Sequence, residues 1–355
     1  MDVVASAPGK LVLLGEYAVL EGAPALVMAI NRRARVRISA QPGAACEVSA
    51  PDLGIAACAL RFDSVGMPDW SADADAGAKL RLVDQVIRGL AKDSLTLPAG
   101  RGFKLALDTA EFFDADSVAR PKLGLGSSAA LTVALASALA VFAGRGAVTA
   151  NRKVWLDKLL VLHRDFQDGR GSGVDVAASL VGGLMSYRLR TAGAEPFCEA
   201  LDWRPMSLKH LSIWSGKAAS TSNLLGALAQ WRQSHEAEYQ AHMKALTVIA
   251  GVSRQAVLDQ RGDRLLEAVT GYAGELREFS AATGLQIFSP EHEQLTKLAA
   301  QSGVCYKSCG AGGGDFGIAL TPDAERLADA RKRIVAAGFR CPPLSCDEQG
   351  LHLDY

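Results

Sequence analysis

The chain has 355 residues, of which 49% are hydrophobic and 21% charged, a composition typical of a soluble globular protein with a sizeable core. Lysine plus arginine and aspartate plus glutamate both number 38, so no overall field favours nucleic acid or an anionic membrane. Any anion-binding site must therefore be local.

The seven cysteines are odd in number and scattered, without a Cys-x-x-Cys pair, which predicts free thiols in a reducing cytosol. Cys305 and Cys309 flank a strand-like segment, and we interpret them as parts of a strand and a loop rather than as metal ligands. The N-terminus lacks the basic region of a signal peptide, and the apolar run Val3–Leu14 is interrupted by Pro8-Gly9-Lys10. We therefore expect a cytoplasmic protein, monomeric or homodimeric, with no nucleic-acid or membrane partner.

The first 110 residues consist mainly of short β-like runs that are separated by glycine and proline. The predicted strands are Val3–Ala7, Lys10–Gly15, Ala25–Ile30, Ala34–Ala40 and Phe103–Asp108. Helices are predicted at Ala76–Lys92, at the nearly all-apolar and therefore buried run Ala129–Ala143, and at Arg152–Phe166 and Ser172–Leu180. A strand is predicted at Gly183–Arg190.

A second compositional regime begins near Leu201. It contains a predicted strand at Ser207–Trp214 and predicted helices at Thr221–Arg232, Glu236–Gln260, Asp263–Ala282 and Pro290–Ala300. A strand, a glycine loop and another strand follow over 304–320, and the chain ends with a helix at Ala324–Ala337 and a strand at Gly350–Asp354. Strands followed by runs of helices, twice, predict an α+β protein of two domains, 1–200 and 201–355.

The segment Pro121–Ala130 is a loop with two glycines and two serines that runs into the predicted apolar helix. Its glycines let backbone N–H groups approach an anion, Ser127 and Ser128 can cap the helix or reach a metal, and the first helical turn adds partial positive charge. The pattern favours phosphate binding, with a plain glycine-rich turn before a core helix as the alternative.

Two other nucleotide motifs fit this chain poorly. Gly124-x-Gly126-x-x-Ala129 matches the relaxed dinucleotide fingerprint, but a preceding strand and an acidic residue about 20 positions on are missing. A Walker A loop is absent because neither Gly9-Lys10 nor Gly216-Lys217 is followed by serine or threonine.

Three glycine-bearing motifs occur in order along the chain, at 7–20, 122–130 and 307–320. In these motifs the chain resembles the GHMP small-molecule kinases, the family of galactokinase, homoserine kinase, mevalonate kinase and phosphomevalonate kinase. The resemblance spans essentially the whole chain. It implies a mixed-sheet N-terminal domain with helices and a helix-rich α/β C-terminal domain. It also implies transfer of a phosphoryl group from ATP, with Mg²⁺, to a small phosphorylated or hydroxy-acid acceptor.

The resemblance also assigns roles to residues. It implies that the ATP phosphates bind to the first loop and that the serine at Ser128 ligates Mg²⁺; the loop residues are Gly124, Leu125, Gly126, Ser127, Ser128 and Ala129. It places Lys10 at the transfer site. Glu16 and Tyr17 are expected on the substrate side, Glu16 as a site-organising residue with a structural buried acid as the alternative. The wall between nucleotide and acceptor is expected at Gly310, Ala311, Gly312 and Gly313, where the alternative is a tight connection between strands.

Asp175 matches the family's active-site aspartate, which alcohol-phosphorylating members use as a general base, and Ser172 and Gly173 precede it. A lone aspartate at a helix start is more often a cap, but the motif context favours the active site. Mevalonate kinases usually carry Gly-Glu-His and a metal-binding glutamate before the Ser-Gly-x-Asp segment. This chain has Gly-Glu-Tyr17, and Gln167 and Asp168 are its candidates for a second Mg²⁺ ligand.

Phosphomevalonate kinases of the family are the nearest match, through Gly-Glu-Tyr, a lysine at Lys122 before the phosphate loop, and a hydroxyl-rich segment after a central strand. The candidate acceptor ligands in that segment are Ser215, Lys217, Ser220, Thr221 and Ser222, with a solvated helix cap as the alternative. Two unit charges of like sign about 4 Å apart repel by about 4 kcal/mol at an effective dielectric near 20, which Lys10, Lys122 and Mg²⁺ can offset.

A phosphate acceptor is already ionised at neutral pH, because its second pKa is near 6, and so it needs little help from a base. We therefore expect Asp175 to orient Lys10 more than to remove a proton. The alternative functions are a mevalonate kinase or another alcohol-phosphorylating member of the family, and a catalytically silent ligand-binding regulator.

Overall fold

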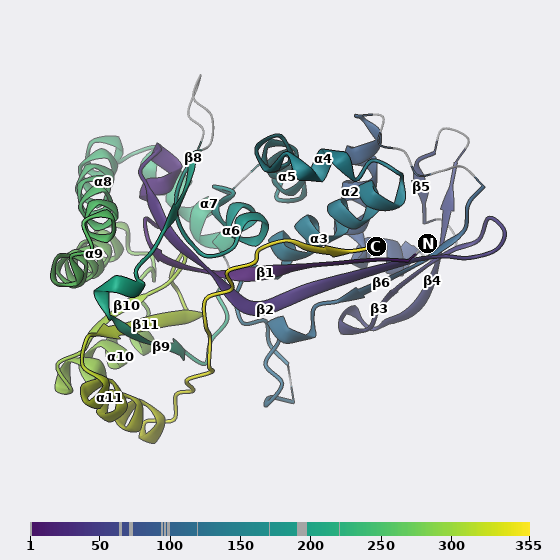
Figure 1. Ribbon diagram of the computed structural model, residues 1–355. Coiled ribbons are helices and arrows are strands. Elements are labelled where there is room, and N and C mark those ends of the chain that lie inside the picture. Colours follow the sequence, from purple (N-terminus) through teal and green to yellow (C-terminus); the bar gives the residue numbers. More distant parts are fainter. Residues whose placement is uncertain are drawn as a thin grey trace.

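The computed structural model describes residues 2–355 except 64–65, 71–73, 94, 96, 98–99, 119, 170, 190–196 and 220, and it leaves out the side chain of Ser222. The described residues form a large mixed sheet with helices on one face and a small antiparallel sheet with its own helices (Figure 1). The α+β class that the sequence predicts is confirmed.

The large sheet has nine strands among the described residues. They are β1 (Asp2–Leu14), β2 (Ala25–Ala40), β3 (Cys46–Ala50), β4 (Ile55–Phe62), β5 (Pro68–Asp69), β6 (Phe103–Asp108), β7 (Leu184–Arg188), β8 (Phe197–Leu201) and β12 (His352–Asp354). The strand order is β12-β1-β2-β6-β3-β4-β5, with β7 pairing with β2 and with β8. The β3–β6 pair is parallel and the remaining pairs are antiparallel.

The two longest strands correct a prediction of the sequence. Val3–Ala7 and Lys10–Gly15 are predicted as separate strands, yet both lie in β1 except for Gly15, and the two predicted strands between Ala25 and Ala40 are both part of β2. The pairing of β1 with β2 shifts register between Pro8 and Gly9. Proline has no backbone N–H to donate to the neighbouring strand, so the pairing is interrupted at Pro8. The strand then continues in a shifted register instead of ending there.

Helices α3 and α6 lie directly on β1 and β2, and α2 and α5 pack against them from outside (Figure 1). The helices of this half are α1 (Ala74–Lys79), α2 (Arg81–Ala91), α3 (Ser127–Phe142), α4 (Ala147–Ala150), α5 (Arg152–Phe166) and α6 (Val174–Val181). Every residue of α3 from Ala129 to Phe142 is buried, as its apolar composition predicts. Its N-terminus, which carries Ser127 and Ser128, is therefore anchored in the core.

The small sheet contains β9 (Lys209–Trp214), β10 (Cys305–Ser308) and β11 (Phe316–Thr321) in the order β10-β11-β9. The helices around it are α7 (Thr221–Arg232), α8 (Glu236–Leu258), α9 (Gly262–Thr283), α10 (Pro290–Gln301) and α11 (Ala324–Ala336). Short 3₁₀ turns complete the described elements: η1 (Ala18–Glu21), η2 (Pro51–Leu53), η3 (Ala110–Phe112) and η4 (Arg204–Met206). In the described part of the chain, no helix has the length and apolarity that crossing a membrane requires.

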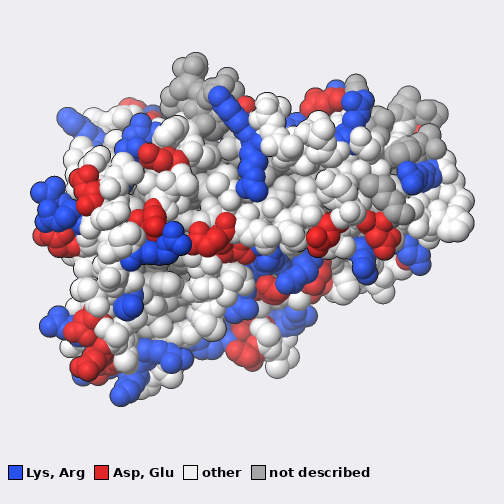
Figure 2. All heavy atoms as spheres, in the orientation of Figure 1, with Lys and Arg blue, Asp and Glu red and all other residues white. Residues whose placement is uncertain are grey.

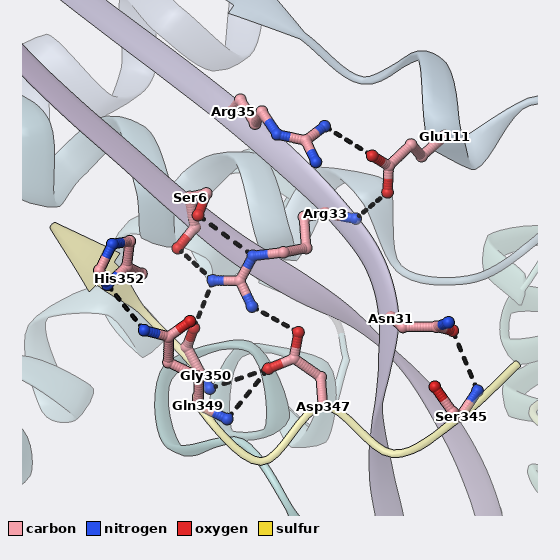
Figure 3. Close-up of polar contacts among 10 residues, drawn as sticks. All are labelled: Ser6, Asn31, Arg33, Arg35, Glu111, Ser345, Asp347, Gln349, Gly350 and His352. Atoms are coloured by element: carbon pink, nitrogen blue, oxygen red, sulfur yellow. Dashed lines mark hydrogen bonds and ion pairs between the residues drawn. The ribbon is translucent and has the colours of Figure 1, made fainter. Parts of the chain in front are cut away.

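The end of the chain returns to the first sheet, where β12 pairs with β1 and the two termini lie close together (Figure 1). We call residues 345–354 the C-terminal strap. Figure 3 shows Arg33 of β2 beneath it, bonded to Ser6, Asp347 and Gly350. The predicted second domain, 201–355, thus includes a strand of the first sheet, and a division at residue 200 stays a prediction.

Candidate active site

A cavity of about 630 Å³ lies where the three glycine motifs meet. Its walls come from β1, the loops before α3, α6 and α7, the end of α5, and the glycine loop between β10 and β11. The predicted site residues in its lining are Lys10, Glu16, Tyr17, Lys122, Gly124, Leu125, Gly126, Ser127, Ser128, Gln167, Asp168, Ser172, Asp175, Thr221, Gly310 and Ala311. The surface charges drawn in Figure 2 are mixed in sign over the face shown, in keeping with the equal numbers of basic and acidic residues.

The phosphate loop follows a path that requires glycine. Gly124 and Gly126 both have left-handed backbones, with φ of 70° and 84°. A Cβ on Gly124 would also lie 2.1 Å from the carboxyl carbon of Asp315. Gly126 is the N-cap of α3, and its carbonyl accepts the Ala130 N–H at 3.1 Å. The amides of the first turn have no intrahelical partner, and Ser127 and Ser128 of that turn line the cavity, at the end of the helix where the dipole favours an anion.

Lys10 and Asp175 both lie against Gly126. A Cβ on Gly126 would be 3.1 Å from Lys10 Cγ and 3.7 Å from Asp175 Cβ. The Lys10 N–H donates to the Leu125 carbonyl at 2.9 Å, and Lys10 Nζ donates to the Gly124 carbonyl at 3.4 Å. Among the described residues, no ion pair joins Lys10 to Asp175; Asp175 instead accepts the Val176 N–H at 3.0 Å. The role of Asp175 in orienting Lys10 stays a prediction.

The segment before α6 is held by Tyr187, which is fully buried and donates its hydroxyl to the Ser172 carbonyl at 2.7 Å. Burial raises the pKa of Tyr187 well above its ordinary value, so the phenol remains a donor. Gly173 lies behind this contact, where a Cβ would be 3.2 Å from the Tyr187 hydroxyl. The predicted residue Gly173 therefore supports the wall without lining the cavity.

A buried ion pair joins the first motif to the third. Lys307 Nζ lies 2.5 Å from Glu16 Oε1, and the two side chains are 0% and 3% exposed. The Gly310 N–H donates to the same carboxylate oxygen at 3.1 Å. The Tyr17 hydroxyl donates to the Ala311 carbonyl. Glu16 and Tyr17 thus fix the glycine loop against the end of β1, whereas the partner Lys307 was missed because its charge has no local sequence signal.

The residues near Ser128 fit a magnesium ion. Mg²⁺ prefers oxygen ligands and is usually bound by one or two protein groups together with substrate phosphates. Ser128 and Gln167 both line the cavity and carry side-chain oxygens. The carboxylate of Asp168 instead accepts from Arg81 at 3.0 Å, at an exposed position. Gln167 is therefore the better placed of the two candidates for a second ligand.

The predicted acceptor ligands in the loop before α7 lie in different surroundings. The Ser215 hydroxyl donates to the Lys217 carbonyl at 3.2 Å and accepts the Lys217 N–H at 3.3 Å, so Ser215 closes a turn. Lys217 is exposed and, like Ser215, is not among the lining residues that the structure describes. Thr221 does line the cavity. Ser220 and the side chain of Ser222 lie outside the described part of the chain.

Other predicted residues pack behind the cavity wall. Gly312 has no room for a side chain, because a Cβ there would lie 1.9 Å from the Ile287 carbonyl oxygen, and Gly313 faces Leu224. Ala129 is fully buried in the first turn of α3. These three residues shape the loops from behind and are absent from the described lining.

Asp315 lines the cavity and was not predicted. Its Oδ1 accepts the Ala219 N–H at 3.0 Å, and its backbone N–H donates to the Lys217 carbonyl at 2.7 Å. Burial raises the pKa of this carboxyl, and the Lys10 charge partly opposes that effect. Its place in the sequence, directly after the glycine run, was the signal that could have pointed to Asp315 as a site residue. Asp315 fastens the loop before α7 to the glycine loop.

Lys122 is exposed at the cavity rim, with its Nζ 5.9 Å from the centre of the Phe113 ring. The segment between Phe113 and Lys122 closes on itself through a β-bridge. It is anchored by the buried Asp114, which accepts from Arg340 Nη1 at 2.5 Å. Contacts from the far end of the chain thus hold the segment that carries Lys122.

Comparisons with known proteins identify this architecture. Residues 81–183 match the model of the GHMP kinase N-terminal domain. The chain is 32% identical to a phosphomevalonate kinase of Streptomyces sp. (strain CL190), over 98% of each chain. The chain belongs to the GHMP kinase family. As a family member it is an ATP-dependent phosphotransferase, of the group that includes the mevalonate and phosphomevalonate kinases.

Two further comparisons agree with this assignment. The kinase is 23% identical to a mevalonate kinase of Thermococcus gammatolerans, over 100% of this chain and 99% of the relative. Its fold is similar to that of a phosphomevalonate kinase of Streptococcus pneumoniae solved with phosphomevalonate and AMPPNP, with a TM-score of 0.77 and 21% identity. That likeness covers 97% of this chain and 99% of the other, and it confirms the GHMP kinase fold.

Proposed function

We propose that this GHMP kinase transfers the γ-phosphoryl group of ATP to (R)-5-phosphomevalonate and forms 5-diphosphomevalonate. The observation that carries the proposal is the presence of two lysines, Lys10 and Lys122, at one cavity with the phosphate loop. The 32% identity to a phosphomevalonate kinase along nearly the whole chain supports the same acceptor.

The two lysines suit an acceptor that is itself an anion. In the reaction, a phosphate oxygen of the acceptor forms a bond to the γ-phosphorus as the bond to the β–γ bridging oxygen breaks, and ADP leaves. Both partners are multiply charged, and like unit charges about 4 Å apart repel by about 4 kcal/mol at an effective dielectric near 20. Lys10 beside Gly124 and Lys122 at the rim offset that repulsion from two directions.

We infer that the Ser128 hydroxyl, with the Gln167 amide as the candidate second ligand, would hold Mg²⁺ together with the ATP phosphates. The metal, when bound, neutralises charge on the transferred group. The first-turn amides of α3 then hold the phosphates in place. Catalysis by this chain consists of positioning and charge neutralisation and needs no covalent nucleophile.

The decisive experiment is an acceptor assay on the purified full chain. ADP formation is measured with ATP and Mg²⁺ in the presence of mevalonate, of phosphomevalonate or of neither. We expect ADP only with phosphomevalonate, and diphosphomevalonate as the product by mass spectrometry. Turnover of mevalonate alone would replace the proposal with a mevalonate kinase. Silence with both, despite ATP binding, would favour a regulator that binds the nucleotide.

A mevalonate kinase is the second candidate because Asp175 lies at the cavity, in the position that the family uses for a general base. The roles of the two groups can be separated. With phosphomevalonate as acceptor, Asp175→Asn should reduce the single-turnover rate less than Lys10→Met or Lys122→Met does. An aspartate variant that is by far the worst of the three would instead indicate proton removal from an alcohol.

The acceptor charge is tested by Lys122→Met with Lys104→Met as control. Lys104 is an exposed lysine of β6 that pairs with Glu47 at 3.8 Å and does not line the cavity. Loss of a charge-assisted contact worth about 1.5–3 kcal/mol should lower kcat/KM for phosphomevalonate about 10- to 100-fold. The control should leave it within twofold. Equal values for the two variants would remove Lys122 from the acceptor site.

A further inference from the structure

His163 lies at the N-terminus of α3 without being part of the phosphate loop. It is 2% exposed, and its Nε2 is 3.2 Å from Ser128 Oγ. Helix α5, which carries His163, is bound to α3 a few turns further along by the Trp155 indole, which donates to Ser137 Oγ at 2.9 Å in the core. The imidazole is therefore fixed relative to the serine by the packing of two helices.

A serine hydroxyl that gives its oxygen to a cation must direct its hydrogen elsewhere. A neutral imidazole with its proton on Nδ1 offers Nε2 as an acceptor for that hydrogen. The oxygen lone pairs of Ser128, a residue of the cavity lining, then remain available to a cation. Without such an acceptor the hydroxyl would rotate among staggered positions or bond to nearby backbone, as serine near a helix start readily does.

We propose that His163 is a positioning residue that accepts the Ser128 hydroxyl hydrogen and so aims Ser128 Oγ at the metal of a metal–nucleotide complex. This inference rests on the proposed role of Ser128 as a Mg²⁺ ligand. Gln167 caps the C-terminus of α5, where its N–H donates to the His163 carbonyl at 3.1 Å, and Gln167 lines the cavity. The C-terminal end of α5 thus carries both the residue that would orient the first ligand and the candidate second ligand.

The competing explanation is that His163 only fills the core between α3 and α5. The two explanations differ in what Mg²⁺ does to nucleotide binding. A positioning role makes the metal-dependent part of the binding sensitive to the imidazole, whereas a packing role alters stability, or binding with and without metal alike. Partners that orient metal ligands commonly change metal affinity about 10- to 100-fold when they are replaced.

The experiment measures binding of AMPPNP to the full chain by calorimetry, with Mg²⁺ and with EDTA, in the absence of any acceptor. The variants are His163→Gln, whose amide reaches the Nε2 position, His163→Asn, whose amide reaches only the Nδ1 position, and His163→Leu. We expect His163→Leu and His163→Asn to lose about 10- to 100-fold of the Mg²⁺-dependent affinity. His163→Gln should keep most of it, and binding in EDTA should change less than threefold in all variants.

The inference is overturned if His163→Asn retains the Mg²⁺ effect as well as His163→Gln does, or if the losses are equal with and without metal. Because His163→Leu could fail to fold, the comparison of Gln with Asn decides on its own. Ser128→Ala provides the separate check of the metal site. If Ser128→Ala leaves the Mg²⁺ effect intact, the proposed ligand is wrong, whatever the histidine variants do. The choice of acceptor does not enter any of these measurements.

Discussion

Two ion pairs join the start of the chain to its end, and they differ in what lies beside them. Glu16 and Lys307 are 291 positions apart and meet at the wall of the cavity. Arg33 and Asp347 are 314 positions apart and meet under the C-terminal strap, against β1 and β2 (Figure 3). Both pairs are largely buried, at 0% and 3% exposure for the first and 14% and 10% for the second.

The pairs also differ in how completely their polar atoms are satisfied. Arg33 donates to Asp347, to both Ser6 oxygens and to the Gly350 carbonyl, so the guanidinium is used on all sides. In the pair at the cavity, Glu16 Oε2 is buried without a hydrogen-bond partner among the described residues. A buried unpaired acceptor costs about 1–3 kcal/mol. The Glu16–Lys307 pair at the cavity therefore carries an unsatisfied acceptor that costs stability, whereas the hydrogen bonds of the Arg33–Asp347 pair are more complete.

Breaking the cavity pair should have the largest effect. Lys307→Met leaves the Glu16 carboxylate buried without a cation, and breaking one side of such a pair typically costs about 3–5 kcal/mol. The glycine loop loses its anchor at the same time, so we expect ADP formation to fall with stability. Urea unfolding and steady-state turnover measure the two effects.

The matched control for this prediction is the double variant Glu16→Gln with Lys307→Met. It removes both charges while keeping the volume, and replacing a whole buried pair is often close to neutral for stability. Recovery of stability without recovery of turnover would show that the pair serves the site. A loss of less than about 1 kcal/mol for Lys307→Met alone would contradict the claim that Glu16 is left as an unpaired buried charge.

Breaking the strap pair should cost less and leave catalysis unchanged. Arg33→Met removes four donated hydrogen bonds, yet Asp347 Oδ1 still accepts the Gln349 and Gly350 N–H groups. We expect a loss of about 2–3 kcal/mol in urea unfolding, with kcat and KM within twofold of the parent. A large fall in kcat in the folded variant would mean that the strap acts on the site through α6, whose C-terminus it contacts.

A third long-range pair, Asp114 with Arg340, should make a contribution to stability that depends on pH. The hydrogen bonds from Arg340 hold the pKa of Asp114 below its ordinary value of about 4. A carboxyl with a lowered pKa in the folded protein adds stability above its unfolded pKa and loses it as the pH falls through the folded pKa. The contribution is therefore complete at neutral pH and disappears in acid.

Asp114→Asn should then be less stable than the parent by about 1–2 kcal/mol at pH 7, a value reduced by solvent screening because the Arg340 side chain is 35% exposed. The difference should shrink as the pH falls below about 4, the ordinary pKa of the carboxyl. Urea unfolding at pH 7, 5 and 3 measures it. A deficit that is the same at every pH would assign the effect to packing. The segment carrying Lys122 should also loosen, which would raise KM for the acceptor.

The long-range pairs mark the limit of what the sequence predicts. Helices with a local pattern are predicted to the residue, as at Arg152–Phe166 and Thr221–Arg232. The strands β3, β4, β5 and β8 were missed; β8, for example, is only partly buried, so its pattern is weak. Such strands are fixed by their neighbours rather than by their own residues.

The same limit applies to the site. The three glycine motifs, Lys10, Lys122 and Asp175 are visible in the sequence and come together at one cavity, although their roles stay predictions. Lys307 and His163 were not visible as functional residues, because a buried lysine or histidine has no periodic signature. Their meaning depends on partners at Glu16 and Ser128 that only the fold brings near.

Arg35 provides the smallest expected effect and the closest control for Arg33. It lies two residues along the same strand and pairs with Glu111 at 2.6 Å, but the two side chains are 46% and 29% exposed (Figure 3). Exposed pairs of this kind contribute about 0–1 kcal/mol. Glu111 also keeps the Arg33 backbone N–H as a donor at 2.8 Å, so no buried group is left unpaired. Arg35→Met should thus lower the free energy of unfolding by less than about 0.5 kcal/mol in urea, compared with the loss of about 2–3 kcal/mol expected for Arg33→Met. Equal losses for the two variants would mean that the stability cost comes from removing a charge from β2. Burial of Arg33 beneath the strap would then not explain it.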